Sequence, residues 1–149
     1  MLRLTVRVPW KRAASTLVVV AYVVGGLTLL LWPQHVDPWF GLDETAPATA
    51  PLRWLGVPQS QWWTIIEIGS NVALFVPFGF ALALVLTRRP VVRTVLAGLA
   101  TSVAFELLQA VLPIDRTPSV GDVVANTCGA ALGALLGVGV VRWTRRSTM

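Results

Sequence analysis

Four apolar stretches dominate the sequence, and each is long enough to cross the hydrocarbon core of a bilayer. They cover about residues 13–32, 63–86, 91–112 and 120–143, whereas a transmembrane helix needs about 20 predominantly apolar residues. Only 13% of the 149 residues are charged, and soluble domains carry about 25%. The sequence therefore predicts an all-α fold, a bundle of four transmembrane helices in one integral membrane domain that covers residues 1–149.

The first stretch, residues 13–32, follows a basic start and contains no charged residue. Its apolar run is longer than the about 7–15 residues of a signal-peptide core. We therefore expect a retained membrane anchor.

Basic residues predict the orientation, because loops on the cytoplasmic side carry an excess of Lys and Arg. Ten of the 12 cationic residues flank the stretches on one side: Arg3, Arg7, Lys11, Arg12, Arg88, Arg89, Arg93, Arg142, Arg145 and Arg146. The other two, Arg53 and Arg116, fall in the alternate loops. All seven acids lie in those loops or near helix ends that face them. We expect a multi-pass protein of the cell membrane with both termini in the cytoplasm.

The loop at residues 33–62 carries five prolines. It shows neither strand alternation nor a clear helical stripe, which predicts an irregular segment on the outer side. Trp39, Phe40 and Trp54 are its candidates for contact with the lipid surface.

Polar side chains of the last three stretches share one depth. At 1.5 Å rise per residue, Glu106 and Asn126 each lie about 10 Å inside the outer end of their helix, and Asn71 lies about 12 Å inside. Ionisable groups at such depth are costly when they face lipid, so they should face the interior and pair. Helical spacing also aligns Glu67 with Asn71, Asp122 with Asn126, and Glu106 with Gln109. We expect these six residues to line one wet pocket that opens to the outer side, with Arg116 above it.

Structural roles compete with this interpretation. Ser119 and Asp122 fit a capping box, in which the acid satisfies the start of its own helix. The amides of Asn71, Gln109 and Asn126 could serve only to join helices. Glu67 is close enough to the interface to reach outward. Glu106 falls near a helix C-terminus, where the dipole disfavours a negative charge, and this makes a structural role for it harder to assign.

Small residues recur along the last stretch at Gly129, Gly133 and Gly137. This spacing lets two helices approach closely in lipid, and it predicts packing within the chain or, as the alternative, a homodimer. Cys128 lies among these residues and is predicted to be a small packing residue. Pro77 should kink its helix because it removes a backbone hydrogen bond, and Gly79 could accommodate the bend.

The sequence contains no motif for several classes of function. There is no Ser–His arrangement, P-loop or dinucleotide fingerprint, so no cofactor is expected. His35 is the only histidine and predicts no metal site, although Glu67, Glu106 and Asp122 leave a carboxylate site as a minor alternative. The net charge of +5 is explained by the membrane asymmetry, so no nucleic-acid partner is expected.

Three polar motifs carry a family resemblance. NVALFVPFGF, FELLQAVLP and GDVVANTCGAALG, with Arg116 between the last two, resemble the VanZ-like family of small bacterial membrane proteins over about residues 67–133. The resemblance implies an integral membrane protein of the cell envelope, and the namesake of the family is associated with resistance to teicoplanin. The positions that match its repeated polar residues are Glu67, Asn71, Glu106, Gln109, Arg116, Asp122 and Asn126.

Three functions fit these features. The preferred one is a membrane protein that binds or modifies a lipid-linked cell-wall component, or protects against an amphiphilic antibiotic, through the outward pocket. An alternative is an outer-leaflet enzyme in which Glu106 or Asp122 is the general acid or base. A further alternative is a small proton-coupled transporter that uses the buried acids.

Overall fold

The computed structural model describes residues 16–17, 20–22, 24–25, 49–112 and 118–147. The elements bounded in these ranges are the helices α3 (Ala50–Trp54), α4 (Trp62–Val85), α5 (Pro90–Val111) and α6 (Val120–Arg146), with the 3₁₀ turn η2 (Gln59–Gln61) before α4. These ranges contain no strand. The predicted all-α class is confirmed for them.

Among the described residues, three helices are long and apolar enough to cross a membrane: Gln59–Val85, Pro90–Val111 and Val120–Arg146. The last three predicted spans match these helices closely. The predicted first span lies mostly outside the described residues, although those of its residues that are described are helical. A fourth span and the orientation of the termini stay predictions.

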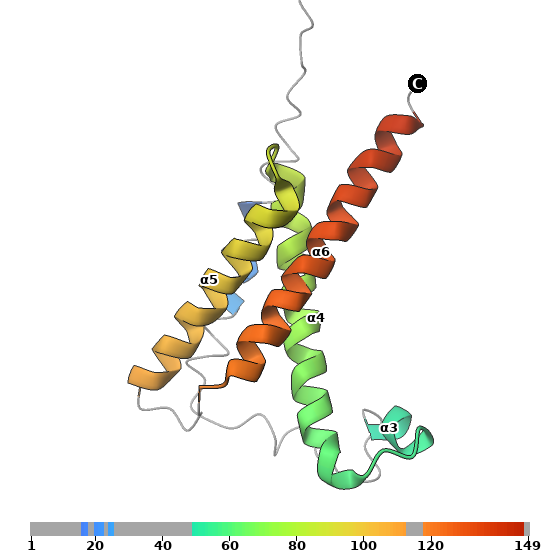
Figure 1. The fold of residues 1–149 in the computed structure, drawn as a ribbon, viewed down its shortest axis with the longest axis vertical. Coiled ribbons are helices and arrows are strands. Elements are labelled where there is room, and N and C mark those ends of the chain that lie inside the picture. The colour runs from blue at the N-terminus through green and yellow to red at the C-terminus, as the bar shows by residue number, and fades with distance from the viewer. Residues whose placement is uncertain (1–15, 18–19, 23, 26–48, 113–117, 148–149) are drawn as a thin grey trace, which may run out of the picture.

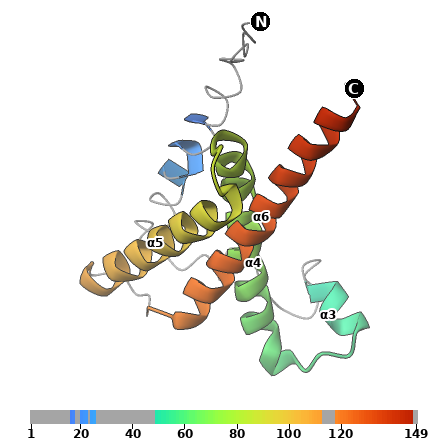
Figure 2. The same cartoon turned by 45° about the horizontal axis from the view of Figure 1, so that its top comes forward.

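The long helix α6 is the centre of the arrangement. Figure 1 shows α4 and α6 running in the same direction, with α5 antiparallel to both. α6 contacts α4 extensively and α5 to a lesser degree, and both contacts exceed the one between α4 and α5. Figures 1 and 2 agree that α4 and α5 diverge away from their short connection, with the first turns of α6 between them.

Large apolar side chains cover the outside of these helices, while small ones fill the inside. Leu107, Leu135 and Leu136 are 57–63% exposed, whereas Ala130 and Ala134 are fully buried. In lipid the outer apolar surface needs no cover, and small residues at the contacts let the backbones approach. This distribution is what a membrane-spanning bundle requires.

Glycines make the contact between α4 and α6 close. A side chain on Gly133 would meet the carbonyl oxygen of Val76 and the backbone nitrogen of Phe80, and one on Gly79 would meet the backbone of Ala130. Gly129 and Gly137 are likewise buried against α4. The stripe therefore packs within the chain, and dimerisation through it, which would require α4 to leave, stays a prediction.

Gly79 admits the backbone of α6, and its predicted accommodation of a bend stays a prediction. Helix α4 continues through Pro77 without interruption, and Pro77 is exposed. The predicted kink at Pro77 stays a prediction.

An aromatic cluster joins the start of the chain to α4. The ring of Tyr22 lies 5.2 Å from that of Phe75 and 4.9 Å from that of Phe78, between ring centroids. Such tilted and edge-on pairs are favourable beyond the area they bury. Tyr22 belongs to the predicted first span, so this part of the span lies against α4.

The segment before α4 is more regular than predicted. Part of the expected irregular loop forms α3 and η2, and residues 33–48 lie outside the described residues. Leu52 is buried, while Trp54 is 86% exposed. The indole of Trp62 is buried and donates a hydrogen bond of 2.8 Å to the Val57 carbonyl. Trp62 therefore holds this segment to the start of α4.

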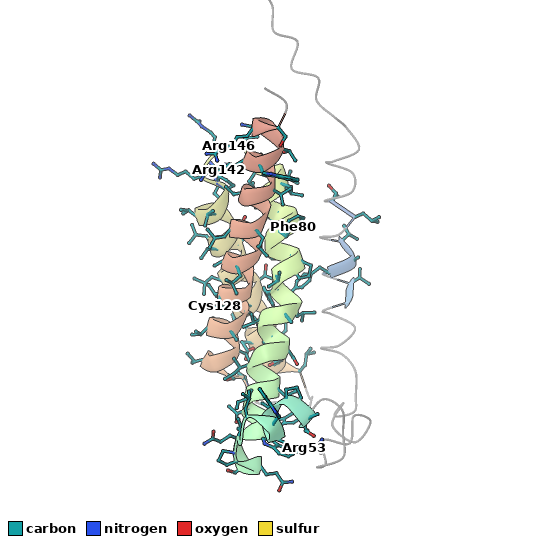
Figure 3. The ribbon with its side chains drawn as sticks, turned by 90° about the vertical axis from the view of Figure 1, so that its right-hand side faces the viewer. Arg53, Phe80, Cys128, Arg142 and Arg146 are labelled. Atoms are coloured by element: carbon teal, nitrogen blue, oxygen red, sulfur yellow. The ribbon has the colours of Figure 1, made fainter. Side chains whose placement is uncertain are left out.

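Cys128 corrects another prediction. It is exposed and lies on the outer surface of α6 (Figure 3). Buried positions of α6 are Ala125, Asn126, Gly129, Ala130, Gly133, Ala134 and Gly137. Cys128 falls outside this helical phase, so it is not an interior packing residue.

Candidate functional site

The two ends of the bundle carry opposite charge. Arg142 and Arg146 lie at one end of the molecule, and Arg53 lies at the other (Figure 3). The connection between α4 and α5, with Arg88 and Arg89, is at the same end as the C-terminus of α6 (Figure 1). The acids Glu67, Glu106 and Asp122 belong to the parts of α4, α5 and α6 nearer the opposite end. The candidate site is at this acidic end.

Asn71 and Asp122 join α4 to α6. The Asn71 side-chain amide donates a hydrogen bond of 2.6 Å to Asp122 Oδ1, and both residues are half-buried. Asn71 lies one turn before the buried Phe75, while Asp122 lies in the first turn of α6. The close packing of α4 and α6 thus brings a donor and an acceptor into register.

Glu106 joins α5 to the first residue before α6. Its Oε2 accepts a hydrogen bond of 2.6 Å from the backbone N–H of Ser119, which is the N-cap of α6. The N-terminus of a helix favours a negative charge. Glu106 is therefore placed favourably, although it lies near the C-terminus of its own helix.

The predicted capping box is correct in one half and wrong in the other. Ser119 Oγ accepts a hydrogen bond of 3.4 Å from the Asp122 N–H, as expected of an N-cap residue. In a capping box the acid three residues after the N-cap would accept a hydrogen bond from the N-cap N–H. Here Glu106 of α5 accepts that hydrogen bond in place of Asp122. The Asp122 carboxylate can therefore bind Asn71.

A further bond lies about one turn deeper along α6. The Asn126 amide donates to Ser102 Oγ at 2.9 Å, and Asn126 is only 6% exposed. Asn126 Oδ1 has no hydrogen-bond partner within the described part of the chain. Ser102 is fully buried and was missed by sequence reasoning, although it lies four residues before Glu106 on the same face of α5.

Three predicted site residues remain: Glu67, Gln109 and Arg116. Glu67 is exposed near the start of α4, and Gln109 is half-buried one turn beyond Glu106. Arg116 lies outside the described residues. Glu106, Asn71 and Asn126 bond different partners, and each of the three bonds involves the N-cap or one of the first two turns of α6. The cluster thus consists of three neighbouring pairings, and the predicted wet pocket at this end stays a prediction.

The chemistry of this cluster is that of hydrogen bonding. The carboxylates of Glu106 and Asp122 each accept a hydrogen bond from an N–H group. The described residues contain no group of His, Cys, Asp or Glu side chains that could hold a metal ion. A carboxylate metal site on Glu67, Glu106 and Asp122 stays the minor alternative.

Long apolar helices, small residues at their contacts and a polar cluster toward one end define an α-helical membrane protein. The VanZ/LLP1 family model matches residues 17–142. The chain belongs to this family, and the predicted resemblance is confirmed. Comparison with curated proteins and with solved structures gave no match.

Proposed function

We propose that this protein binds the polar headgroup of an amphiphilic molecule in the outer leaflet of the cell membrane, at the acidic end of α4, α5 and α6. The class of ligand is a lipid-linked cell-wall component or an amphiphilic glycopeptide such as teicoplanin. The protein would then contribute to the bacterial cell envelope and to antibiotic resistance. The polar cluster on the first two turns of α6 is the observation that supports this proposal.

The position of the cluster suits such a ligand. Its groups lie within a few turns of the helix ends, so a headgroup can reach them while its apolar tail stays among the exposed leucines and valines of the helices. Sugars and peptides need both donors and acceptors, which amides and carboxylates supply. Gln109 and Glu67 lie beside the bonded groups and are the first candidates to contact the ligand.

Arg116 completes the proposed site. In the sequence it lies between α5 and α6, ten residues after Glu106 and three before Ser119. A guanidinium binds phosphate with two parallel hydrogen bonds, and lipid-linked cell-wall precursors carry phosphate at the junction of headgroup and tail. Arg116 is proposed to bind that phosphate.

Gln109 provides a test that leaves the helix pairings intact. Gln109→Ala should weaken binding of fluorescently labelled teicoplanin or lipid-linked precursor about three- to tenfold, the effect of one lost hydrogen bond. Leu108→Ala is the matched control, because it truncates an exposed neighbour in the same turn. Binding is measured on purified protein in nanodiscs.

Arg116→Lys keeps the positive charge but loses the planar guanidinium with its paired donors. It should weaken binding of the phosphate-bearing ligand only. Unchanged binding of both ligands by both variants would contradict the proposal.

Glu106→Gln separates the binding role from the enzymatic and proton-coupled alternatives. The glutamine oxygen can still accept from the Ser119 N–H, but the group no longer ionises. Cells that express this variant should keep the teicoplanin protection of the wild type, measured as the minimum inhibitory concentration. Loss of protection by a variant that folds normally would favour acid–base chemistry or proton transfer through Glu106.

A further inference from the structure

A hollow at the arginine-rich end is independent of the polar cluster. It has a volume of about 400 Å³ and lies between the first turn of α5 and the last turns of α6. Its lining comprises Arg89, Pro90, Val91, Val92, Val138 and Arg142. The exposed lining is almost entirely apolar, so Arg89 and Arg142 contribute mainly their aliphatic stems to it and carry their guanidinium groups beyond it.

We propose that this hollow binds one anionic phospholipid of the leaflet at the arginine-rich end. The lipid phosphate would lie between the guanidinium groups of Arg89 and Arg142, and the first methylenes of its acyl chains would lie against Val92 and Val138. The proposal concerns the opposite end of the bundle from the cluster of Asn71, Glu106 and Asp122. It therefore stands or fails separately from the proposed function.

Charge complementarity favours an anionic lipid. The sequence has no Asp or Glu in residues 68–105 or 123–149, so the segments that form this end supply no side-chain carboxylate to Arg89 or Arg142. Arg88, Arg93, Arg145 and Arg146 add to the positive field of the same end. Basic residues at a membrane surface attract anionic lipid, and Arg binds phosphate through two parallel bonds.

The backbone of α5 adds to the attraction. Arg89 is the N-cap of α5 and Pro90 follows as its first residue, so the N–H groups of Val91 and Val92 have no carbonyl partner within the helix. These groups and the helix dipole favour a negative charge at this point. The side chain, the helix start and the hollow therefore favour the same phosphate position.

The backbone conformation of Arg89 suggests a substitution that removes the charge and keeps the backbone in place. Its φ is 48°, in the left-handed region that Asn adopts more readily than Arg. Arg89→Asn should therefore remove the charge without disturbing the connection between α4 and α5. Arg142 is exposed on α6, and Arg142→Gln keeps a good helix former at that position.

The test is native mass spectrometry of the detergent-purified chain titrated with palmitoyl-oleoyl phosphatidylglycerol or with the matching phosphatidylcholine. Wild-type protein should retain one phosphatidylglycerol in preference to phosphatidylcholine. The double variant Arg89→Asn/Arg142→Gln should bind phosphatidylglycerol about tenfold or more weakly, because each arginine near the surface contributes separately. Arg88→Gln/Arg146→Gln is the matched control, since it removes the same charge from neighbouring residues outside the hollow and should bind almost as wild type.

Val92→Trp tests the hollow itself, because Val92 is 54% exposed and its replacement fills the space with the charges intact. Weaker phosphatidylglycerol binding is expected. An equal loss of phosphatidylglycerol binding in the two double variants would show that the total positive charge, and not the hollow, attracts the lipid. This result would overturn the proposal. Equal binding of phosphatidylcholine, full retention by Arg89→Asn/Arg142→Gln, or full competition by glycerol 3-phosphate would overturn it as well.

Discussion

Glu106 and Asp122 have exchanged the roles that their sequence positions suggest. Asp122 occupies the capping position of α6, but its carboxylate binds Asn71, while Glu106 accepts from the N-cap N–H across the helix contact. One acid thus satisfies a helix end and the other joins two helices. The first two turns of α6 gain bonds to both neighbouring helices from this exchange.

Asn71 and Asp122 allow the bond between α4 and α6 to be tested by exchanging donor and acceptor. Asn71→Asp alone places two carboxylates together and should destabilise the bundle by more than the about 0.6–2 kcal/mol of an interhelical bond in lipid. Asp122→Asn alone should cost less, since an amide oxygen still accepts. The double variant Asn71→Asp/Asp122→Asn restores a donor and a charged acceptor, and should recover much of the loss of Asn71→Asp.

The measurement is the free energy of unfolding in mixed micelles for all four proteins, combined as a double-mutant cycle. A coupling energy near zero would show that the two residues do not depend on each other.

At this scale the sequence predicts which residues are polar and at what depth, but not which partner each one takes. Depth follows from helical rise alone. Partner choice depends on the rotation of each helix about its axis, and this is set by the glycine contacts between α4 and α6. Ser102 was missed for the same reason, since a serine in an apolar helix gives no signal until Asn126 is placed against it.

Among the helices, α6 has the contact face that leaves the least room for side chains. Gly129, Gly133 and Gly137 lie where α4 passes so closely that any side chain would meet backbone atoms. Substitutions on this face should therefore act on the helix contact, whereas those on its outer face should act only on helix propensity.

Gly133→Ala and Gly139→Ala form a matched pair on α6. A methyl group at Gly133 would meet Val76 and Phe80, whereas one at Gly139 has nothing within 4 Å. Gly133→Ala should cost about 1–3 kcal/mol by overpacking, while Gly139→Ala should be neutral or stabilise by up to about 1 kcal/mol through helix propensity. The thermal unfolding midpoint by circular dichroism in detergent measures both. A Gly133→Ala protein as stable as the wild type would contradict the close contact.

Long helices could be predicted almost to their ends, because an apolar run bounded by charge or proline has few alternatives in lipid. The helix α3 could not, since five residues that include Pro51 give too short a run for helical periodicity to appear. Its position depends instead on Leu52 and on the bond of Trp62 to Val57.

For the molecule as a whole, charge divides the two ends. The described part of the arginine-rich end and the acidic end differ in sign along the bundle axis, as the distribution of basic residues predicts. This division separates the two proposed lipid sites, so the orientation of the chain decides which leaflet each site meets.

Orientation can be tested with two single cysteines in a Cys128→Ser background. Ser60 and Ser147 are both exposed, at opposite ends, and Ser→Cys changes little in size. A membrane-impermeant maleimide applied to intact cells should label Ser60→Cys, and should label Ser147→Cys only after permeabilisation. The reverse pattern would place the polar cluster on the cytoplasmic side and contradict the proposed access from the outer leaflet.

The central place of α6 has a consequence for how the protein is made. Ribosomes deliver α4 and α5 before α6, and the partners of Asn71, Glu106 and Ser102 all lie on α6 or at its N-cap. Until that helix enters the membrane, these side chains must be sheltered by the insertion machinery or by water. A nascent chain that stops before residue 119 would therefore present unpaired hydrogen-bonding groups to lipid, which gives membrane proteases a chemical mark by which to recognise an unfinished product.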